Sequence, residues 1–169
     1  MNQMFSLENY KILLAKFYRF YSAVETELAK LDLKQYGYDL AERLKTPKLE
    51  KDLENLGLIA EAKNLPAWEN LPGLNSAENA FGTLYVIEGA TLGGQIINRH
   101  LKQNLDLTPD NGGLFFNGYG DQTGPRWKEF CQVATEFASV TNTDETIVQS
   151  AKDTFDSFKN CFQEPIRIG

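Results

Sequence analysis

Four glycines interrupt a segment that otherwise has the pattern of a helix, residues 82–101. Gly82, Gly89 and Gly93 are spaced by seven and four residues, which puts them on one helix face, and Gly94 follows directly. Each glycine inside a helix costs roughly 1 kcal/mol relative to alanine, so four cost on the order of 4 kcal/mol. In return the helix gains a surface without Cβ atoms, against which a flat ligand can bind. Local conflicts of this kind tend to mark functional sites.

Close packing of two helices over small residues explains the same spacing equally well. A phosphate-binding glycine loop is disfavoured, because no strand precedes the segment and the glycines do not have the spacing of such a loop. Gly93 and Gly94 together also permit a bend in the helix.

The other side chains that could do chemistry are few. His100 is the only histidine. It lies about eleven residues, or roughly 16 Å along a helix, beyond Gly89, where interaction with the helix end explains it. Cys131 and Cys161 fall on apolar faces and are expected to be reduced core thiols of a cytoplasmic protein. One histidine and no Glu-x-x-His pair argue against a di-iron centre. We predict no metal-binding residues, and the catalytic residues stay unassigned.

The composition predicts a soluble globular protein, with 42% hydrophobic and 24% charged residues. A length of 169 residues suits one domain, residues 1–169, and is short for two. No stretch approaches the ~18 apolar residues of a membrane span, and no signal peptide is visible. We therefore expect a cytoplasmic protein without a membrane partner. A net charge of −6 without a basic stripe also argues against nucleic acid as a partner.

The elements around the glycine segment are all predicted to be helices. Apolar residues recur at steps of three and four, and no period-2 run is found, which indicates an all-α helical bundle. The longest helices are expected near residues 6–31, 76–103, 125–140 and 144–163, with a shorter one before Gly57. Ser6, Thr46 and Asn75 are the expected N-caps, with Phe5 in a hydrophobic staple. Residues 65–74 and 107–124 are predicted to be loops.

Five stretches, in this order, resemble heme oxygenases, above all the bacterial branch associated with bacteriophytochromes: LEKDLENLG (49–57), LYVIEGATLGGQ (84–95), FFNGYG (115–120), WKEF (127–130) and AKDTF (151–155). The resemblance covers nearly the whole chain and implies a heme-oxygenase-like helical bundle. In that family heme lies between a proximal helix, which supplies the iron-ligating histidine, and a distal helix, here residues 84–95. The products of the family reaction are biliverdin, carbon monoxide and iron.

The resemblance also implies a heme-binding set. Gly89 and Gly93 would let the backbone approach the heme, and Gly94 would allow the bend. Ala90 stands where mammalian-type members have an aspartate that organises distal water. Lys152 stands where members have a basic residue near a heme propionate, although a solvated lysine fits that position equally well.

The histidine of the family's proximal helix has no counterpart before Ser6, where only five residues stand. Met1 and Met4 lie nearest to its position, and methionine is a known heme ligand. We therefore expect a heme-oxygenase-like protein whose heme cleavage is impaired or altered. A non-catalytic relative, which binds a tetrapyrrole or another protein, is the alternative, and thiaminase-type hydrolysis is a more distant one.

A bundle without its first helix would leave an apolar groove exposed. Several hundred Å² at roughly 25 cal/mol per Å² corresponds to about 10 kcal/mol of burial not made. We therefore expect a two-fold homodimer, with contacts from residues such as Tyr10, Phe17 or Tyr21. The competing expectation is a monomer in which residues 107–124 fold over the groove.

Overall fold

The computed structural model describes residues 6–169, which form six α-helices and no strand. These are α1 (Leu7–Leu28), α2 (Thr46–Asn55), α3 (Ile59–Lys63), α4 (Ala77–Leu105), α5 (Thr123–Thr141) and α6 (Asp144–Gln163). Three 3₁₀ turns, η2 (Lys34–Tyr36), η3 (Leu40–Arg43) and η4 (Gly120–Gln122), lie in the connections. The all-α prediction is confirmed, and the four long helices end within three residues of their predicted bounds. Phe5, Met1 and Met4 lie outside the described residues.

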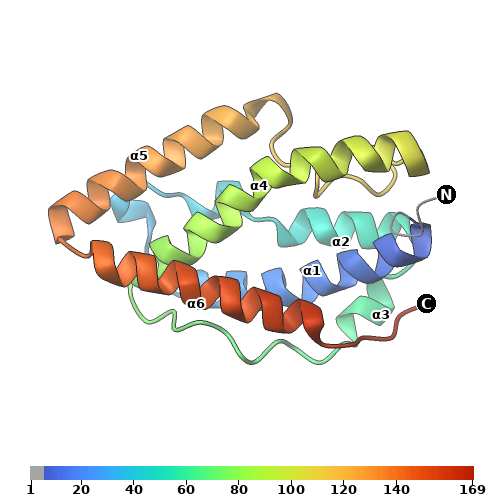
Figure 1. The fold of residues 1–169 in the computed structure, drawn as a ribbon, viewed down its shortest axis with the longest axis horizontal. Coiled ribbons are helices and arrows are strands. Elements are labelled where there is room, and N and C mark those ends of the chain that lie inside the picture. The colour runs from blue at the N-terminus through green and yellow to red at the C-terminus, as the bar shows by residue number, and fades with distance from the viewer. Residues whose placement is uncertain (1–5) are drawn as a thin grey trace.

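The helices are arranged around α4, which contacts both α5 and α6 (Figure 1). α1 and α2 lie side by side, and α6 packs on the N-terminal half of α4. Gly82 is the reason that α4 and α6 approach so closely, because a Cβ atom there would overlap the Ile147 carbonyl oxygen and the Ser150 Cβ. Helix packing therefore accounts for the first of the four glycines.

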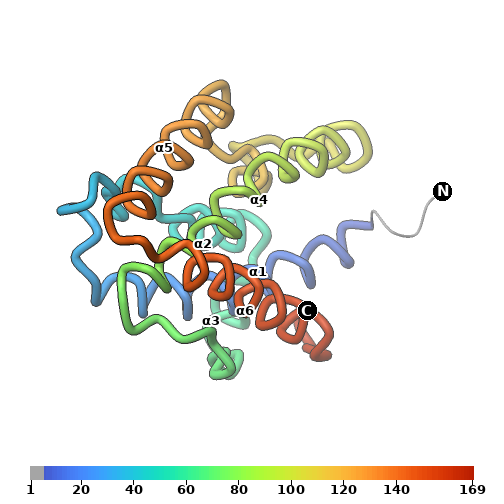
Figure 2. Tube along the Cα trace, turned by 60° about the vertical axis from the view of Figure 1, so that its left-hand side comes forward, coloured from blue at the N-terminus to red at the C-terminus, as the bar shows by residue number. Residues whose placement is uncertain are grey.

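The axis of α4 changes direction near its middle in both views (Figures 1 and 2), while the helix runs unbroken from Ala77 to Leu105. Gly93 and Gly94 lie just past the middle of its 29 residues, where the bend was predicted. The carbonyl oxygen of Phe116 lies 3.4 Å from the position of a Gly94 Cβ, so the connection from α4 to α5 packs directly on this part of the helix.

Two of the three predicted N-caps are wrong. Ser6 caps α1 as expected, but Ser76 rather than Asn75 caps α4, accepting a hydrogen bond from the Asn79 backbone N–H. α2 begins at Thr46, so Lys45 stands at the N-cap position, and the buried Thr46 hydroxyl has no hydrogen-bond partner among the described residues. The buried Glu25 carboxylate of α1 accepts from the backbone N–H groups of Lys45 (2.7 Å) and Thr46 (2.9 Å) instead. An anion from a neighbouring helix satisfies this helix start better than the local hydroxyl does.

The predicted dimer contact through α1 is also wrong for the three residues named, because they belong to the chain's own core. Tyr10, Phe17 and Tyr21 are 4%, 8% and 2% exposed. The Tyr10 hydroxyl donates to the Gly112 carbonyl oxygen at 2.6 Å. The aromatic face of α1 therefore faces a segment of the same chain, as in the competing expectation.

That segment is the loop between α4 and α5, called here the covering loop (residues 106–122). Its Phe115 and Phe116 rings lie 5.0 and 5.2 Å from the ring of Phe17. The Asp52 carboxylate of α2 fixes the loop by accepting from the backbone N–H groups of Leu114 and Phe115, both at 2.8 Å. Ring packing and these two hydrogen bonds hold the loop over α1.

Candidate functional site

Three hollows follow one another along α4. The covered cavity, of about 260 Å³, lies between α1, α2, α4, α6 and the covering loop. The α4 groove, of about 430 Å³, lies between α1, α4, α5 and α6 and shares Tyr21, Ala90 and Phe158 with the covered cavity. The α5–α6 hollow, of about 690 Å³, shares Tyr85 and Phe155 with the groove. The shared residues make the three hollows neighbours on one continuous face.

The lining of the α4 groove is apolar and partly open to solvent. Tyr85, Leu92 and Phe155 are 49%, 41% and 54% exposed, although they are large hydrophobic side chains. The indole ring of Trp127 from α5 lies 5.5 Å from the Tyr85 ring. A contiguous exposed apolar surface of this kind is typical of a binding site.

The structure brings the predicted α4 residues to this face, but it gives them different roles. Ala90 is exposed and lines both the groove and the covered cavity. Gly93 and Gly94 line the covered cavity, and a Cβ atom on Gly93 would meet no atom within 4 Å. A Cβ atom on Gly89 would instead lie 3.4 Å from the Trp127 ring. Gly89 therefore admits Trp127, and Gly93 leaves open space.

Lys152, the fifth predicted residue, lies apart from the other four. It is an exposed residue of α6 and lines the α5–α6 hollow together with Tyr85 and Phe155. Those two rings also line the α4 groove, so Lys152 provides a positive charge at the next hollow along the face. This exposed position is compatible with both roles considered for Lys152, a partner of a heme propionate and a solvated lysine.

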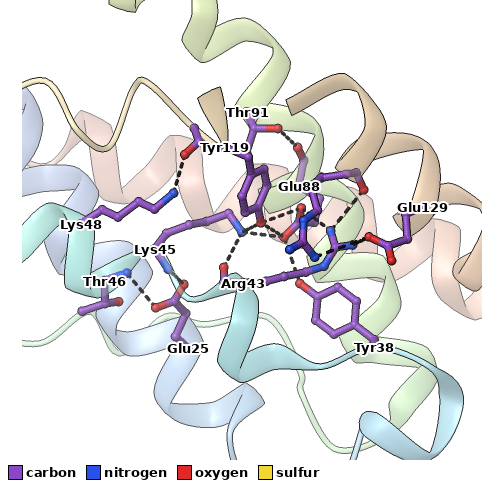
Figure 3. A network of polar contacts seen from close by, with 12 residues as sticks. Glu25, Tyr38, Arg43, Lys45, Thr46, Lys48, Glu88, Thr91, Tyr119 and Glu129 are labelled. Carbon is purple, nitrogen blue, oxygen red and sulfur yellow. Dashed lines mark hydrogen bonds and ion pairs between the residues drawn. The ribbon is translucent and has the colours of Figure 1, made fainter. Parts of the chain in front are cut away.

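Sequence reasoning missed a buried carboxylate, Glu88 on α4, which is 0% exposed. Figure 3 shows the polar side chains that surround it. Four side chains donate hydrogen bonds to it: the hydroxyls of Tyr38 (2.9 Å) and Tyr119 (2.9 Å), Lys45 Nζ (2.6 Å) and Arg43 Nη1 (3.1 Å). A charged residue inside the otherwise apolar run 84–90 was the available signal. We call these five residues the Glu88 cluster.

The Glu88 cluster extends from the wall of the covered cavity to the surface. Lys45 and Tyr119 line the cavity, while Arg43 also binds Glu129 at 2.6 Å, whose side chain is 58% exposed. Burial, and after it the charge of Glu88, raises the pKa of both the Tyr38 and the Tyr119 hydroxyl. Both tyrosines therefore stay protonated donors over the physiological pH range.

The described residues offer no cluster of histidine, cysteine and carboxylate side chains that could hold a metal ion. His100 lies near the end of α4 and lines none of the three hollows. Cys161 is fully buried and Cys131 is half-buried, and neither lines a hollow. Residues 6–169 also contain no helix long and apolar enough to span a bilayer.

Comparison with known proteins gives one family. Residues 1–164 match the family model described as heme oxygenase. A heme oxygenase of Xanthomonas campestris pv. campestris (strain 8004) is 25% identical over 160 residues, which cover 95% of this chain and 92% of that protein. No solved structure gave a significant match. Since the family model spans nearly the whole chain, whose helices form the cavity and groove described above, the chain belongs to the heme oxygenase family.

Proposed function

We propose that this chain binds a tetrapyrrole in the α4 groove. The observation that carries the proposal is the exposed apolar lining beside a strip of α4 with small side chains. Ala90 and Gly93 are exposed on this strip, and Tyr85 and Phe155 stand beside it half-exposed. A flat apolar macrocycle would cover these rings and gain both burial and stacking.

The residues present fit the organic part of heme. The small residues of α4 leave space for a flat ring, and the aromatic side chains supply contact area. Lys152 would pair with a propionate through a charge-assisted hydrogen bond, while its apolar neighbours hold the macrocycle. Bound heme would supply the iron at which the family activates dioxygen.

We further propose that cleavage of heme to biliverdin, carbon monoxide and iron is impaired or altered in this chain. None of the three hollows is lined by its single histidine, His100. Ala90 also provides no carboxylate on the α4 face where mammalian-type members have an aspartate. The chain's own residues would then orient the tetrapyrrole and exclude water, with weaker control over the iron.

Hemin titration, followed by absorbance and by quenching of tryptophan fluorescence, tests the groove. Ala90→Phe would fill the shared wall of the groove and the covered cavity. Ala60→Phe is the matched control, because Ala60 is also an exposed helical alanine but lies on α3, outside the hollows. We expect Ala90→Phe to weaken hemin binding tenfold or more, about 1.4 kcal/mol, and Ala60→Phe to leave it unchanged. Equal affinities for the two variants would contradict the proposal.

The iron ligand is tested separately with the hemin complex of His100→Ala. We expect its optical spectrum to equal that of the parent protein, because His100 lines none of the hollows. Biliverdin formation in the presence of an electron donor then measures the turnover that remains. A histidine-type spectrum that disappears in His100→Ala would show that this histidine ligates the iron after all.

The second candidate, a protein-interaction relative that forms a homodimer, is favoured by the same exposed apolar residues. Val148 and Phe155 of α6 are 52% and 54% exposed, so they offer a contact surface that the buried residues of α1 do not. Sedimentation equilibrium with and without hemin distinguishes the two candidates. A dimer that neither binds hemin nor dissociates in its presence would support the second.

A further inference from the structure

The covered cavity is lined by a positively charged side chain, Lys48, which does not line the α4 groove. Lys48 of α2 extends toward the cavity wall beside Tyr119 (Figure 3), with its Nζ 4.9 Å from the centroid of the Tyr119 ring. Among residues 6–169, the ammonium donates one hydrogen bond, to the carbonyl oxygen of Gly118. An ammonium carries three N–H donors, so two remain for a ligand.

The neighbouring lysine at this wall, Lys45, provides a comparison, because its ammonium has a partner for each of its hydrogen-bond donors. Its Nζ donates to the Arg43 carbonyl oxygen (2.9 Å), to Glu88 (2.6 Å) and to the Tyr119 hydroxyl (3.1 Å). All three of its donors are used, and Glu88 balances its charge. Lys45 therefore lines the cavity, but its ammonium is used within the Glu88 cluster and has no donor left for a ligand.

No carboxylate of the described residues forms an ion pair with Lys48. Asp52, one turn further along α2, has its two carboxylate oxygens on the backbone N–H groups of Leu114 and Phe115. Burial, and after it the charge of Lys45, lowers the pKa of the Lys48 ammonium, which is half-buried. The charges of Glu88 and Asp52 act in the opposite direction and raise this pKa, but neither carboxylate forms an ion pair with Lys48. A cation held at an apolar wall without a paired counter-ion favours an anionic ligand.

The rest of the lining sets the size and the character of that ligand. The other large lining side chains are apolar or aromatic: Phe17, Tyr21, Ile97, Phe115, Phe116 and Phe158. An engineered cavity of roughly 150 Å³ in another protein holds benzene, so the covered cavity, at about 260 Å³, has room for about ten non-hydrogen atoms. This is far less than a whole tetrapyrrole and enough for a phenyl ring with a short acid side chain.

We infer that the covered cavity binds a carboxylate carried by a compact aromatic or aliphatic body, with the carboxylate paired to Lys48 and the body among the six apolar side chains. A free small acid and a propionate arm of a bound tetrapyrrole share this chemistry. The inference concerns a ligand site beside the α4 groove, and its first test needs no tetrapyrrole.

The first test is calorimetric titration with 3-phenylpropionate and with its neutral analogue 3-phenylpropanol. Lys48→Met removes the charge and keeps most of the volume, and Lys51→Met is the matched control, since Lys51 lies on the same helix with its side chain 59% exposed. We expect the acid to bind at least tenfold more tightly than the alcohol. Lys48→Met should abolish this preference, Lys48→Arg should retain it, and Lys51→Met should leave it unchanged.

The second test identifies the source of the carboxylate, using hemin and its dimethyl ester. A loss of hemin affinity in Lys48→Met without a loss for the ester would assign the carboxylate to the tetrapyrrole. Loss of phenylpropionate binding with unchanged hemin binding would assign it to a free acid. The inference is wrong if Lys48→Met weakens the binding of neither 3-phenylpropionate nor hemin. It is also wrong if the acid and the alcohol bind equally and Lys48→Met changes the affinities for hemin and its ester alike.

Discussion

Glu88→Gln should strongly destabilise the folded state although it hardly changes the volume of the side chain. The amide keeps the shape of the side chain but removes the negative charge at the centre of the Glu88 cluster. Arg43 and Lys45, whose side chains are 5% and 6% exposed, would then remain buried with only the partly exposed Glu129 to balance them. Removing one partner of a buried ion pair is costly because the other charge stays desolvated.

The magnitude follows from the contacts. The Glu88 carboxylate accepts hydrogen bonds from two charged groups and two hydroxyls. Loss of a buried partner of this kind typically costs about 3–5 kcal/mol, and a domain of this size has a stability of roughly 5–15 kcal/mol. We therefore expect Glu88→Gln to remove a large part of the free energy of unfolding, and to do so without creating a cavity.

Urea denaturation followed by circular dichroism measures the change, with an unchanged m value as evidence that the variant folds like the parent. Glu129→Gln is the control, because this carboxylate also binds Arg43 of the cluster but is 58% exposed. Its loss should cost less than about 1 kcal/mol. Replacing Lys45 by Met in the Glu88→Gln background should restore part of the stability, because it removes one unbalanced charge. A cost of less than 1 kcal/mol for Glu88→Gln would refute this view of the cluster.

Three further predictions concern other parts of the chain. Gly82→Ala should destabilise the protein by about 1–3 kcal/mol, because the new Cβ overlaps α6. Gly93→Ala should stabilise it by roughly 0.5–1 kcal/mol, because its Cβ meets open space. Thermal melts of both variants measure these changes. The raised pKa values of Tyr38 and Tyr119 mean that the unfolded chain releases these protons first, near pH 10, so the urea midpoint should fall progressively above that pH. Burial raises the pKa of the Cys161 thiol to about 11, so a thiol reagent at pH 8 should label the other, half-buried cysteine first.

The glycines show how far local sequence carries a prediction about the site. Their number and spacing predicted an unusual helix, a bend near its middle and a close approach of something to its surface. In the structure the three glycines have different surroundings: Gly82 faces α6, Gly89 faces Trp127 and Gly93 faces open space. The spacing alone could not distinguish these three surroundings. The residues that pack on Gly82 and Gly89 lie more than 35 positions away in the sequence, and none of the described residues packs on Gly93.

The Glu88 cluster could not have been predicted for the same reason. Its members come from positions 38–45, 88 and 119, and only the packing of α4 against the segment before α2 and the covering loop brings them together. Glu25 shows the effect on a smaller scale, because its carboxylate replaces the local Thr46 hydroxyl at the start of α2. Side chains that are satisfied across such distances leave no periodic signal in the sequence.

The sequence by itself determined the all-α class, the positions of the four long helices and the likeness to heme oxygenases, because apolar periodicity and helix boundaries depend on neighbours within a few residues. The tertiary structure decided which faces remain open. The covering loop packs Phe115 and Phe116 over α1 and removes Tyr10, Phe17 and Tyr21 from the surface, where the sequence had placed a dimer contact. The open apolar face lies instead along α4 and α6. An apolar residue is equally suited to a core, an interface or a ligand site, and only the packing of distant segments determines which of these it becomes.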